Sequence, residues 1–257
     1  MQIGVCTGLD GLKGPVDGLA YIEPTVGGLL CPGEDEPAFE AVLAKAQVAP
    51  VRPEAVNCFF PGDLRNTGPD VAAAALDAWV DRACRRAARV GVTAIVFGSG
   101  GSRNVPEGFS RDRASLQLIE NMKRYGPIAA RHGVTIVLEP LSRDSCNIVT
   151  TVDEGAELVR AADHPSIRLL ADTYHMAVDG DPPQAIRRAG GLIAHVHCAE
   201  GDGRGPLGAV GEDQRPYFQA LKDIGYDERI SLECRWDDFE AQLRAGIDEL
   251  RKQWETA

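Results

Sequence analysis

Four side chains able to bind a metal ion end four successive apolar runs in the second half of the chain. They are Glu139, Asp172, His197 and Glu233. If these runs are neighbouring parallel strands, three carboxylates and an imidazole lie at one level, where burying them is costly without a cation between them. The set therefore predicts a divalent metal site. Oxygen ligands with one nitrogen favour Mn²⁺, with Mg²⁺ or Co²⁺ as alternatives, over a structural zinc ion. Four separate ion-paired residues are the other interpretation.

The apolar run over residues 193–198 contains two histidines, and their positions in it predict different roles. His195 and His197 are two residues apart, so both point to the same side of a strand. Only His197 is level with the strand end, which makes it the predicted ligand, whereas His195 fills the interior or supports the ligand. His175 follows Asp172 by three residues on a predicted loop, where it either contacts a substrate oxygen or is solvated.

Short apolar runs rich in branched residues recur along the whole chain and predict parallel strands covered on both faces. They cover residues 3–7, 19–23, 55–60, 94–98, 135–139, 168–172, 193–198 and 229–234. Between them, helical spacing of apolar residues predicts helices over 70–90, 112–132, 151–162, 184–189, 216–224 and 238–254, with Thr151 capping the third. Residues 8–18 are too few and too rich in glycine for a helix, so the first unit is truncated.

The alternation of strand and helix predicts one α/β domain over residues 1–257, a single (β/α)8 TIM barrel with a truncated first helix. A doubly wound sheet is the alternative, but it normally has fewer strands and a GxGxxG turn, which residues 4–8 lack. Barrel enzymes carry their chemistry at the carboxyl ends of the strands, which is where the four predicted ligands are expected.

The composition fits a globular protein and argues against binding to nucleic acid or to an anionic membrane. The 257 residues include 38 acidic and 27 basic side chains, a net charge of −11, and 44% are hydrophobic. Phosphate binding needs clustered Lys and Arg instead. Seven dispersed cysteines form no CxxC pair and are predicted to be core residues, as at Cys6, Cys58 and Cys198. The chain has no signal-peptide pattern or long apolar segment, so a cytoplasmic location is expected.

Four short motifs resemble the sugar phosphate isomerase/epimerase superfamily, the xylose-isomerase-like barrels, and most closely its ketose 3-epimerase branch. They are Glu139-Pro140-Leu141-Ser142-Arg143, Asp172-Thr173-Tyr174-His175-Met176, His195-Val196-His197 and Leu232-Glu233. The resemblance implies that Glu139, Asp172, His197 and Glu233 bind the metal and that the two glutamates are the acid/base pair. It also implies that His175 and Arg204, an arginine after the His-x-His motif, contact substrate oxygens.

Three further residues near the expected site bear on the substrate. Members of the branch often have a glutamate where this chain has Ser145, and a neutral hydroxyl makes no charge-assisted hydrogen bond, so the substrate preference is expected to differ. The glycine-rich loop 97–103 ends in Arg103, which predicts either a contact to an anionic substrate group or a tight turn with a solvated arginine. Glu23, at the end of the second strand, either faces the substrate or pairs with an arginine, and is not assigned to the site.

The predicted reaction is isomerisation or epimerisation of a ketose or keto-sugar derivative through a metal-stabilised enediolate. The metal would acidify a carbon-bound proton, one of Glu139 and Glu233 would remove it, and the other would return a proton from the opposite face. The expected partner is a small sugar, without nucleic acid or membrane, and a homo-oligomer is left open.

Three alternative functions use the same barrel. A metal-dependent keto-polyol (inosose-type) dehydratase or lyase would employ the same residues. An endonuclease-IV-like DNA repair enzyme would need further metal-binding histidines and a basic groove, whereas this chain has five histidines and a net charge of −11. A barrel without catalysis, used only for binding, would not need intact metal ligands.

Overall fold

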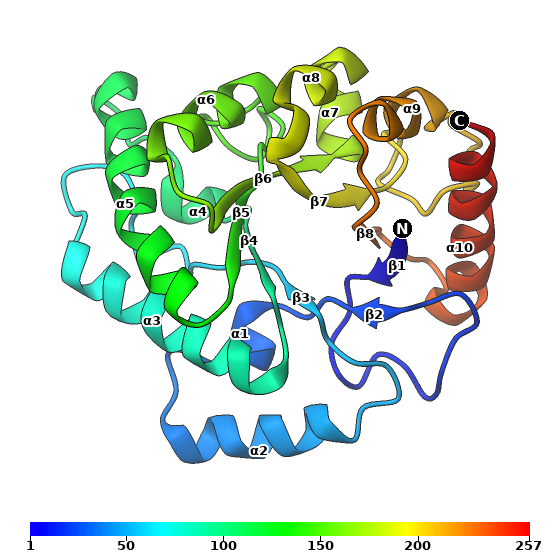
Figure 1. The fold of residues 1–257 in the computed structure, drawn as a ribbon, viewed down its shortest axis with the longest axis horizontal. Coiled ribbons are helices and arrows are strands. Elements are labelled where there is room, and N and C mark those ends of the chain that lie inside the picture. The colour runs from blue at the N-terminus through cyan, green and yellow to red at the C-terminus, as the bar shows by residue number, and fades with distance from the viewer.

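The computed structural model describes residues 1–257 and contains eight parallel strands that curl around a common axis (Figure 1). The strands are β1 (Gln2–Val5), β2 (Tyr21–Ile22), β3 (Ala55–Val56), β4 (Ala94–Phe97), β5 (Thr135–Leu138), β6 (Ile167–Asp172), β7 (Ile193–Cys198) and β8 (Arg229–Leu232). Their order is β2-β1-β8-β7-β6-β5-β4-β3, and parallel bridges from Ile22 to Pro53 and from Thr25 to Asn57 connect the two ends of the sheet. The predicted (β/α)8 barrel is confirmed.

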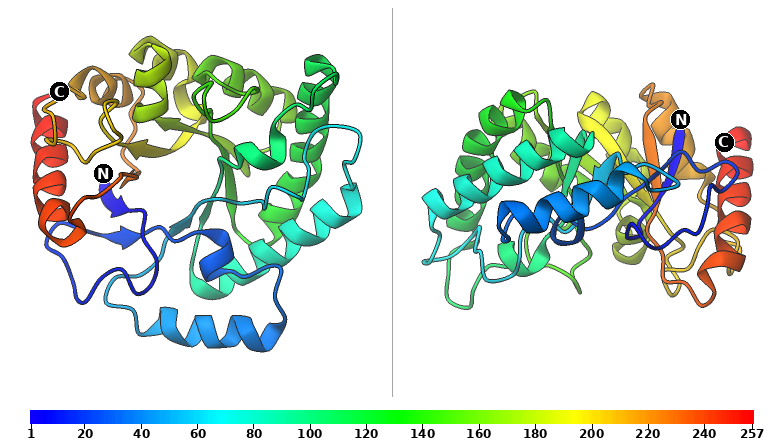
Figure 2. Two further views of the ribbon diagram at one scale, coloured as in Figure 1. Left: turned by 180° about the vertical axis from the view of Figure 1, so that it is seen from behind. Right: turned by 90° about the horizontal axis from the view of Figure 1, so that it is seen from below.

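Helices surround the strands, and the views from behind and below show them on the outside of the barrel (Figure 2). The longer ones are α2 (Glu36–Gln47), α3 (Ala73–Val90), α5 (Arg111–Arg131), α6 (Val152–Ala162), α9 (Arg215–Asp223) and α10 (Phe239–Thr256). The shorter ones are α1 (Val26–Leu29), α4 (Gly100–Arg103), α7 (Thr173–Asp179), α8 (Pro183–Ala189) and the 3-10 helix η1 (Gly190–Leu192). No helix separates β1 from β2, which confirms the truncated first unit. None of the helices is long and apolar enough to cross a membrane.

The predicted elements are all present, with ends that differ by a few residues. Thr151 caps α6 as predicted, because its Oγ1 accepts a hydrogen bond from the Glu154 N–H at 3.1 Å. Helix α2 is not among the predicted helices, although its inner face buries Phe39, Leu43 and Ala46. Their i, i+4, i+7 spacing is typical of an amphipathic helix and is the signal that could have revealed it.

The strand predicted over 55–60 is shorter in the structure because the chain turns sharply at Cys58. The backbone φ angle of Cys58 is 53°, in the left-handed region that a non-glycine residue rarely adopts. Cys58 is therefore exposed, and its predicted place in the core is wrong. Cys198 is buried as predicted, whereas Cys6 is only partly buried.

Tyr21 occupies the interior of the barrel opposite a glycine. Its ring packs with Ala55 and Ala94, and its hydroxyl lies 2.7 Å from Ser231 Oγ on β8. A Cβ atom added at Gly4 would lie 2.2 Å from Tyr21 Cζ. The absence of a side chain at Gly4 therefore leaves the space that the tyrosine ring needs.

We expect Gly4→Ala to lower the free energy of unfolding by about 1–3 kcal/mol, the usual cost of overpacking a well-packed interior. Chemical denaturation would measure the loss. The matched control is Gly14→Ala, where an added Cβ has no neighbour within 4 Å and the stability should stay near that of the wild type. Equal stability of the two variants would contradict the packing argument.

Candidate active site

The structure brings the four predicted metal ligands together at the carboxyl ends of four neighbouring strands. Glu139 follows β5, Asp172 ends β6, His197 lies in β7 and Glu233 follows β8. One potential ligand atom from each lies within 4.8 Å of the other three. His197 Nδ1 is 3.1 Å from Glu139 Oε1 and 3.0 Å from Glu233 Oε2. The cluster follows from the sheet order β8-β7-β6-β5, because parallel neighbours end at the same edge.

Glu139 depends on a glycine and an arginine from the preceding strand and its loop. A Cβ at Gly98 would lie 1.6 Å from Glu139 Oε2, so the carboxylate occupies the space that this glycine leaves open. The fully buried Arg103 donates to the carbonyl oxygens of Phe97, at 2.6 Å, and of Glu139, at 2.5 Å. Its guanidinium thus ties the ends of β4 and β5 together. The alternative of a solvated Arg103 is therefore wrong. Arg103 is also absent from the lining of the cavity described below, in which the predicted contact to a substrate would be made.

Asp172 both ends β6 and caps α7, which fixes the direction of its carboxylate. Its Oδ1 accepts a hydrogen bond from the Tyr174 N–H at 2.8 Å. His175, predicted on a loop, instead lies buried in α7, with Nε2 3.6 Å from Asp172 Oδ2. Its Nδ1 accepts a hydrogen bond from the Ser142 N–H at 3.1 Å. The proton of a neutral His175 ring is therefore on Nε2.

Arg204 lies on the loop between β7 and α9 and reaches two of the acidic residues. Its Nη2 donates to Glu233 Oε2 at 2.5 Å and to Asp172 Oδ2 at 3.4 Å, and its guanidinium stacks 4.6 Å from the centre of the Tyr174 ring. The backbone φ of Arg204 is 59°. The arginine predicted from the motif is thus part of the cluster.

The loop that carries Arg204 is held by a buried carboxylate. Glu200 is fully buried and accepts hydrogen bonds at 2.7 to 3.1 Å from the backbone N–H groups of Gly208, Val210, Gly211 and Glu212. The carboxylate of Glu212 in turn accepts from the N–H groups of Gly201 and Asp202, at 2.6 and 2.9 Å. These reciprocal bonds hold the two ends of the loop together and fix the position of Arg204 between them.

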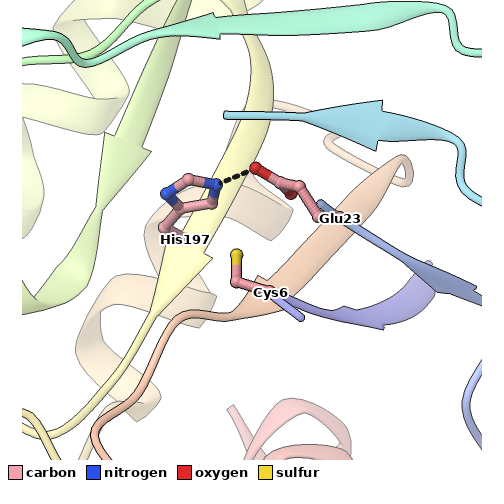
Figure 3. Close-up of side chains that lie close together, drawn as sticks. All are labelled: Cys6, Glu23 and His197. Atoms are coloured by element: carbon pink, nitrogen blue, oxygen red, sulfur yellow. Dashed lines mark hydrogen bonds and ion pairs between the residues drawn. The ribbon is translucent and has the colours of Figure 1, made fainter. Parts of the chain in front are cut away.

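Glu23, which the sequence analysis left unassigned, pairs with both histidines of β7. Its Oε1 lies 2.8 Å from His197 Nε2 and its Oε2 lies 2.8 Å from His195 Nε2, and Ser231 Oγ donates to Oε2 at 2.5 Å. Figure 3 shows the Glu23 carboxylate directed at the imidazole of His197. Because Nε2 of His197 is bonded to Glu23, Nδ1 is directed toward Glu139 and Glu233. The sequence does contain a signal for this pairing. His195 and His197 point to the same side of one strand, and two neighbouring imidazoles inside a barrel need a hydrogen-bonding partner such as a carboxylate.

The residues of the cluster fit a divalent cation. Burial raises the pKa of Glu139, and the carboxylates of Glu233 and Asp172 raise it further. Burial favours the neutral form of His197, yet the carboxylates of Glu23 and Glu233 hold its pKa well above the ordinary value. In both shifts the neighbouring carboxylates favour the protonated form, the form with the less negative or more positive charge. Three carboxylates, one imidazole and a carboxylate behind the imidazole are a donor set suited to such a cation.

Cys6 forms a second potential group of ligands with Glu23 and His197 (Figure 3). Both oxygen atoms of Glu23 already bond to His195, His197 or Ser231, so this carboxylate supports a ligand better than it serves as one. The four-residue cluster is therefore the better candidate for the metal centre.

Two adjoining cavities open onto the cluster. The smaller, about 260 Å³, is lined by Glu139, His175, Arg204, Glu233 and Ser145 among others, and so contains every predicted substrate-binding residue except Arg103. The larger, about 580 Å³, extends over the loops after β1 and β2 to Lys45 of α2. Asn57, Cys58 and Glu233 line both. Cavities of these sizes accommodate a small organic molecule.

A family model described as the xylose isomerase-like TIM barrel matches residues 18–253. The chain belongs to this family. It is 33% identical over 122 residues to the D-psicose 3-epimerase of Ruminiclostridium cellulolyticum, a match that spans 45% of this chain and only 39% of that relative. A putative hydroxypyruvate isomerase of Homo sapiens is 27% identical over 232 residues, or 84% of this chain and 80% of that protein. Among solved structures, the D-psicose 3-epimerase of Clostridium cellulolyticum H10 with D-tagatose has a TM-score of 0.83 at 19% identity over 99% of both chains, which shows a shared fold.

We expect Glu23→Gln to weaken Mn²⁺ binding by about 10- to 100-fold, the usual effect of removing a partner behind a metal-binding histidine. An amide has one oxygen and cannot accept from His195, His197 and Ser231 as the carboxylate does. Isothermal titration calorimetry on the apoprotein would measure the change. Glu107→Gln, an exposed charge-matched control, should bind like the wild type. Equal affinities of both variants would show that Glu23 does not support the metal ligand.

Proposed function

We propose that this protein is a divalent-metal-dependent sugar isomerase/epimerase that acts on a ketose or keto-sugar derivative, with epimerisation next to the carbonyl as its reaction. The observation that supports this most is the cluster of Glu139, Asp172, His197 and Glu233, of which Glu139 and Glu233 line a cavity of small-molecule size. The family membership and the similarity to a D-psicose 3-epimerase point to the same class of reaction.

The four residues of the cluster would hold the metal, for which Mn²⁺ is our first candidate. A bound divalent ion would supply Lewis-acid stabilisation of the negative charge that develops on the substrate oxygens as a carbon-bound proton leaves. Arg204 and the Nε2–H of His175 line the same cavity and would donate hydrogen bonds to substrate oxygens. Without a substrate, the guanidinium of Arg204 compensates the negative charge of Glu233 and Asp172. A bound substrate would therefore lie next to an arginine that is already hydrogen-bonded to these two carboxylates.

Glu139 and Glu233 would transfer the protons. They come from the two ends of the ligand arc, after β5 and β8, so a substrate between them would present one face to each. Burial raises the pKa of Glu139, whereas for Glu233 the effect of burial is outweighed by His197 and Arg204, which hold its pKa below the ordinary value. In the metal-free protein the two carboxyl groups thus differ in proton affinity, and such a difference suits a pair in which one group accepts a proton and the other donates one.

Aldose–ketose isomerisation is the second candidate, because the human relative that matches most of this chain bears the name of a putative hydroxypyruvate isomerase. It begins with the same proton abstraction but returns the proton to the neighbouring carbon. A dehydratase would instead expel water after the first step. Ser145 lines the cavity with a neutral hydroxyl, so it offers a substrate a different contact from the glutamate common in the branch.

Purified protein should bind about one Mn²⁺ per chain, and Asp172→Asn or His197→Ala should weaken this binding by at least 10- to 100-fold, because each removes a direct ligand. Metal analysis after equilibration and desalting would measure the loss. His132→Ala, a histidine paired with Asp81 outside the cluster, is the control and should retain the metal. Unchanged metal content in both cluster variants would overturn the assignment.

The reaction itself is tested by incubating the Mn²⁺-loaded enzyme with ketoses in D2O and following deuterium at the carbon next to the carbonyl by NMR. We expect Glu139→Gln and Glu233→Gln to keep most of the metal while turnover falls by about 10²- to 10⁴-fold, the usual contribution of a positioned acid or base. One variant should still exchange the proton of one epimer without converting it.

Glu157→Gln, an exposed site on α6, serves as the matched control and should turn over normally. A product with the deuterium on the neighbouring carbon would identify an isomerase, and an unsaturated or dicarbonyl product a dehydratase. Normal turnover of both active-site variants with metal bound would show that the two glutamates are ligands only.

A further inference from the structure

Asn57 is a buried polar residue that the proposed mechanism does not use. It follows β3, its side chain lies almost entirely inside the protein at 6% exposure, and its Oδ1 has no hydrogen-bond partner in the chain. Most buried amide oxygens do have such a partner, so each exception calls for a specific explanation. Asn57 lines both cavities, and so does Glu233, one of the two proposed proton-transfer groups.

The backbone around Asn57 is held rigidly. The Asn57 N–H donates to the Pro24 carbonyl at 3.1 Å, and its own carbonyl accepts from the Val26 N–H at 2.8 Å. The next residue, Cys58, has a φ of 53°, and such strained residues cluster at sites that clamp ligands. Two residues further on, the Phe60 N–H donates to Ser99 Oγ at 2.8 Å. The amide of Asn57 is therefore presented to the cavities from a fixed position.

The amide can serve a ligand in either orientation. Because no internal hydrogen bond to Oδ1 fixes its rotation about the Cβ–Cγ bond, it can turn either its oxygen or its NH₂ group toward the cavities. A hydroxyl group both donates and accepts, so it matches either arrangement. An anionic ligand group is disfavoured, because three carboxylates, those of Asp10, Glu23 and Glu233, line the larger cavity against a single lysine, Lys45.

We infer that Asn57 is a specificity-determining residue that binds a substrate hydroxyl beyond the reacting carbon, where the carbon chain passes from the metal-binding cluster into the larger cavity. The inference rests on the proposed function, because it places the reacting carbon between Glu139 and Glu233. The bond to the substrate would satisfy an amide that the free protein leaves unpaired, and a site built this way rejects analogues that lack the hydroxyl.

The test compares the effect of changing Asn57 with the effect of removing single hydroxyl groups from the substrate, as in a double-mutant cycle. The Mn²⁺-loaded wild type, Asn57→Leu and Asn57→Ala are assayed with the best ketose from the D2O screen and with its analogues that each lack one hydroxyl beyond the reacting carbon. Asn57→Leu should lower kcat/KM for the full ketose by about 10-fold, within the range for one lost neutral hydrogen bond. For one deoxy analogue, the same substitution should change kcat/KM by less than about 2-fold.

Val42→Ala is the matched control, because it alters the lining of the larger cavity without removing a polar atom. It should change kcat/KM by the same factor for every substrate. The ratio between substrates does not depend on the fraction of folded enzyme, and Asn57→Ala repeats the measurement with a smaller side chain. Equal losses for the full ketose and all analogues in both Asn57 variants would overturn the inference alone. A wild type that exchanges deuterium into no ketose would overturn the proposed function and this inference with it.

Discussion

The imidazole of His197 lies between the carboxylate of Glu23 on one side and those of Glu139 and Glu233 on the other, and the rest of the site depends on it. One ring nitrogen faces Glu139 and Glu233, and the other bonds to Glu23. Carboxylates at such distances destabilise a fold unless positive charge compensates them. The protein supplies some of that charge through His197 and Arg204, which hold the pKa of Glu233 below its ordinary value, whereas burial and the neighbouring carboxylates raise the pKa of Glu139. A divalent cation at Nδ1 would supply the rest of that charge.

The parallel barrel makes this arrangement possible because the residues that hold the cluster in place are different from the four residues of the cluster itself. Residues inside and behind the sheet, such as Tyr21, Ser231 and Glu23, form a continuous hydrogen-bonded path to His197. Arg103 joins the ends of β4 and β5 through its hydrogen bonds to the carbonyl groups of Phe97 and Glu139. Each group fixes one side chain of the four-residue cluster, and the proposed acid/base catalysis would require such rigidity.

The two cavities divide the expected work on a substrate. The smaller is lined by the groups that would act on the reacting carbons and by Ser145, a neutral residue. The larger offers Thr7, Asp10 and Lys45, a mixture of polar groups of both signs. Asn57 lies where the two meet. Substrate choice in this protein is therefore expected to depend on contacts beyond the reacting carbons, while the proposed chemistry would depend on Glu139, Asp172, His197 and Glu233.

The amino-acid sequence by itself determined the number of strands and the positions of Glu139, Asp172, His197 and Glu233, because both follow from local patterns. Strand runs are short and apolar, and a polar residue at a strand end stands out against them. The distance between those ends also followed, since consecutive parallel strands are neighbours in a barrel.

Only the tertiary structure decided the partners of the remaining polar residues. Glu23 bonds to histidines 172 and 174 positions away, and no local pattern specifies which of several carboxylates will meet them. Arg103, at the end of a glycine-rich loop, could have pointed toward a ligand, but the carbonyl groups at the ends of β4 and β5 bind its guanidinium inside the protein. Nothing in the local sequence distinguishes Asn57 from the other polar residues near strand ends. Its Oδ1 is unpaired because none of the segments that the fold brings around it offers a donor.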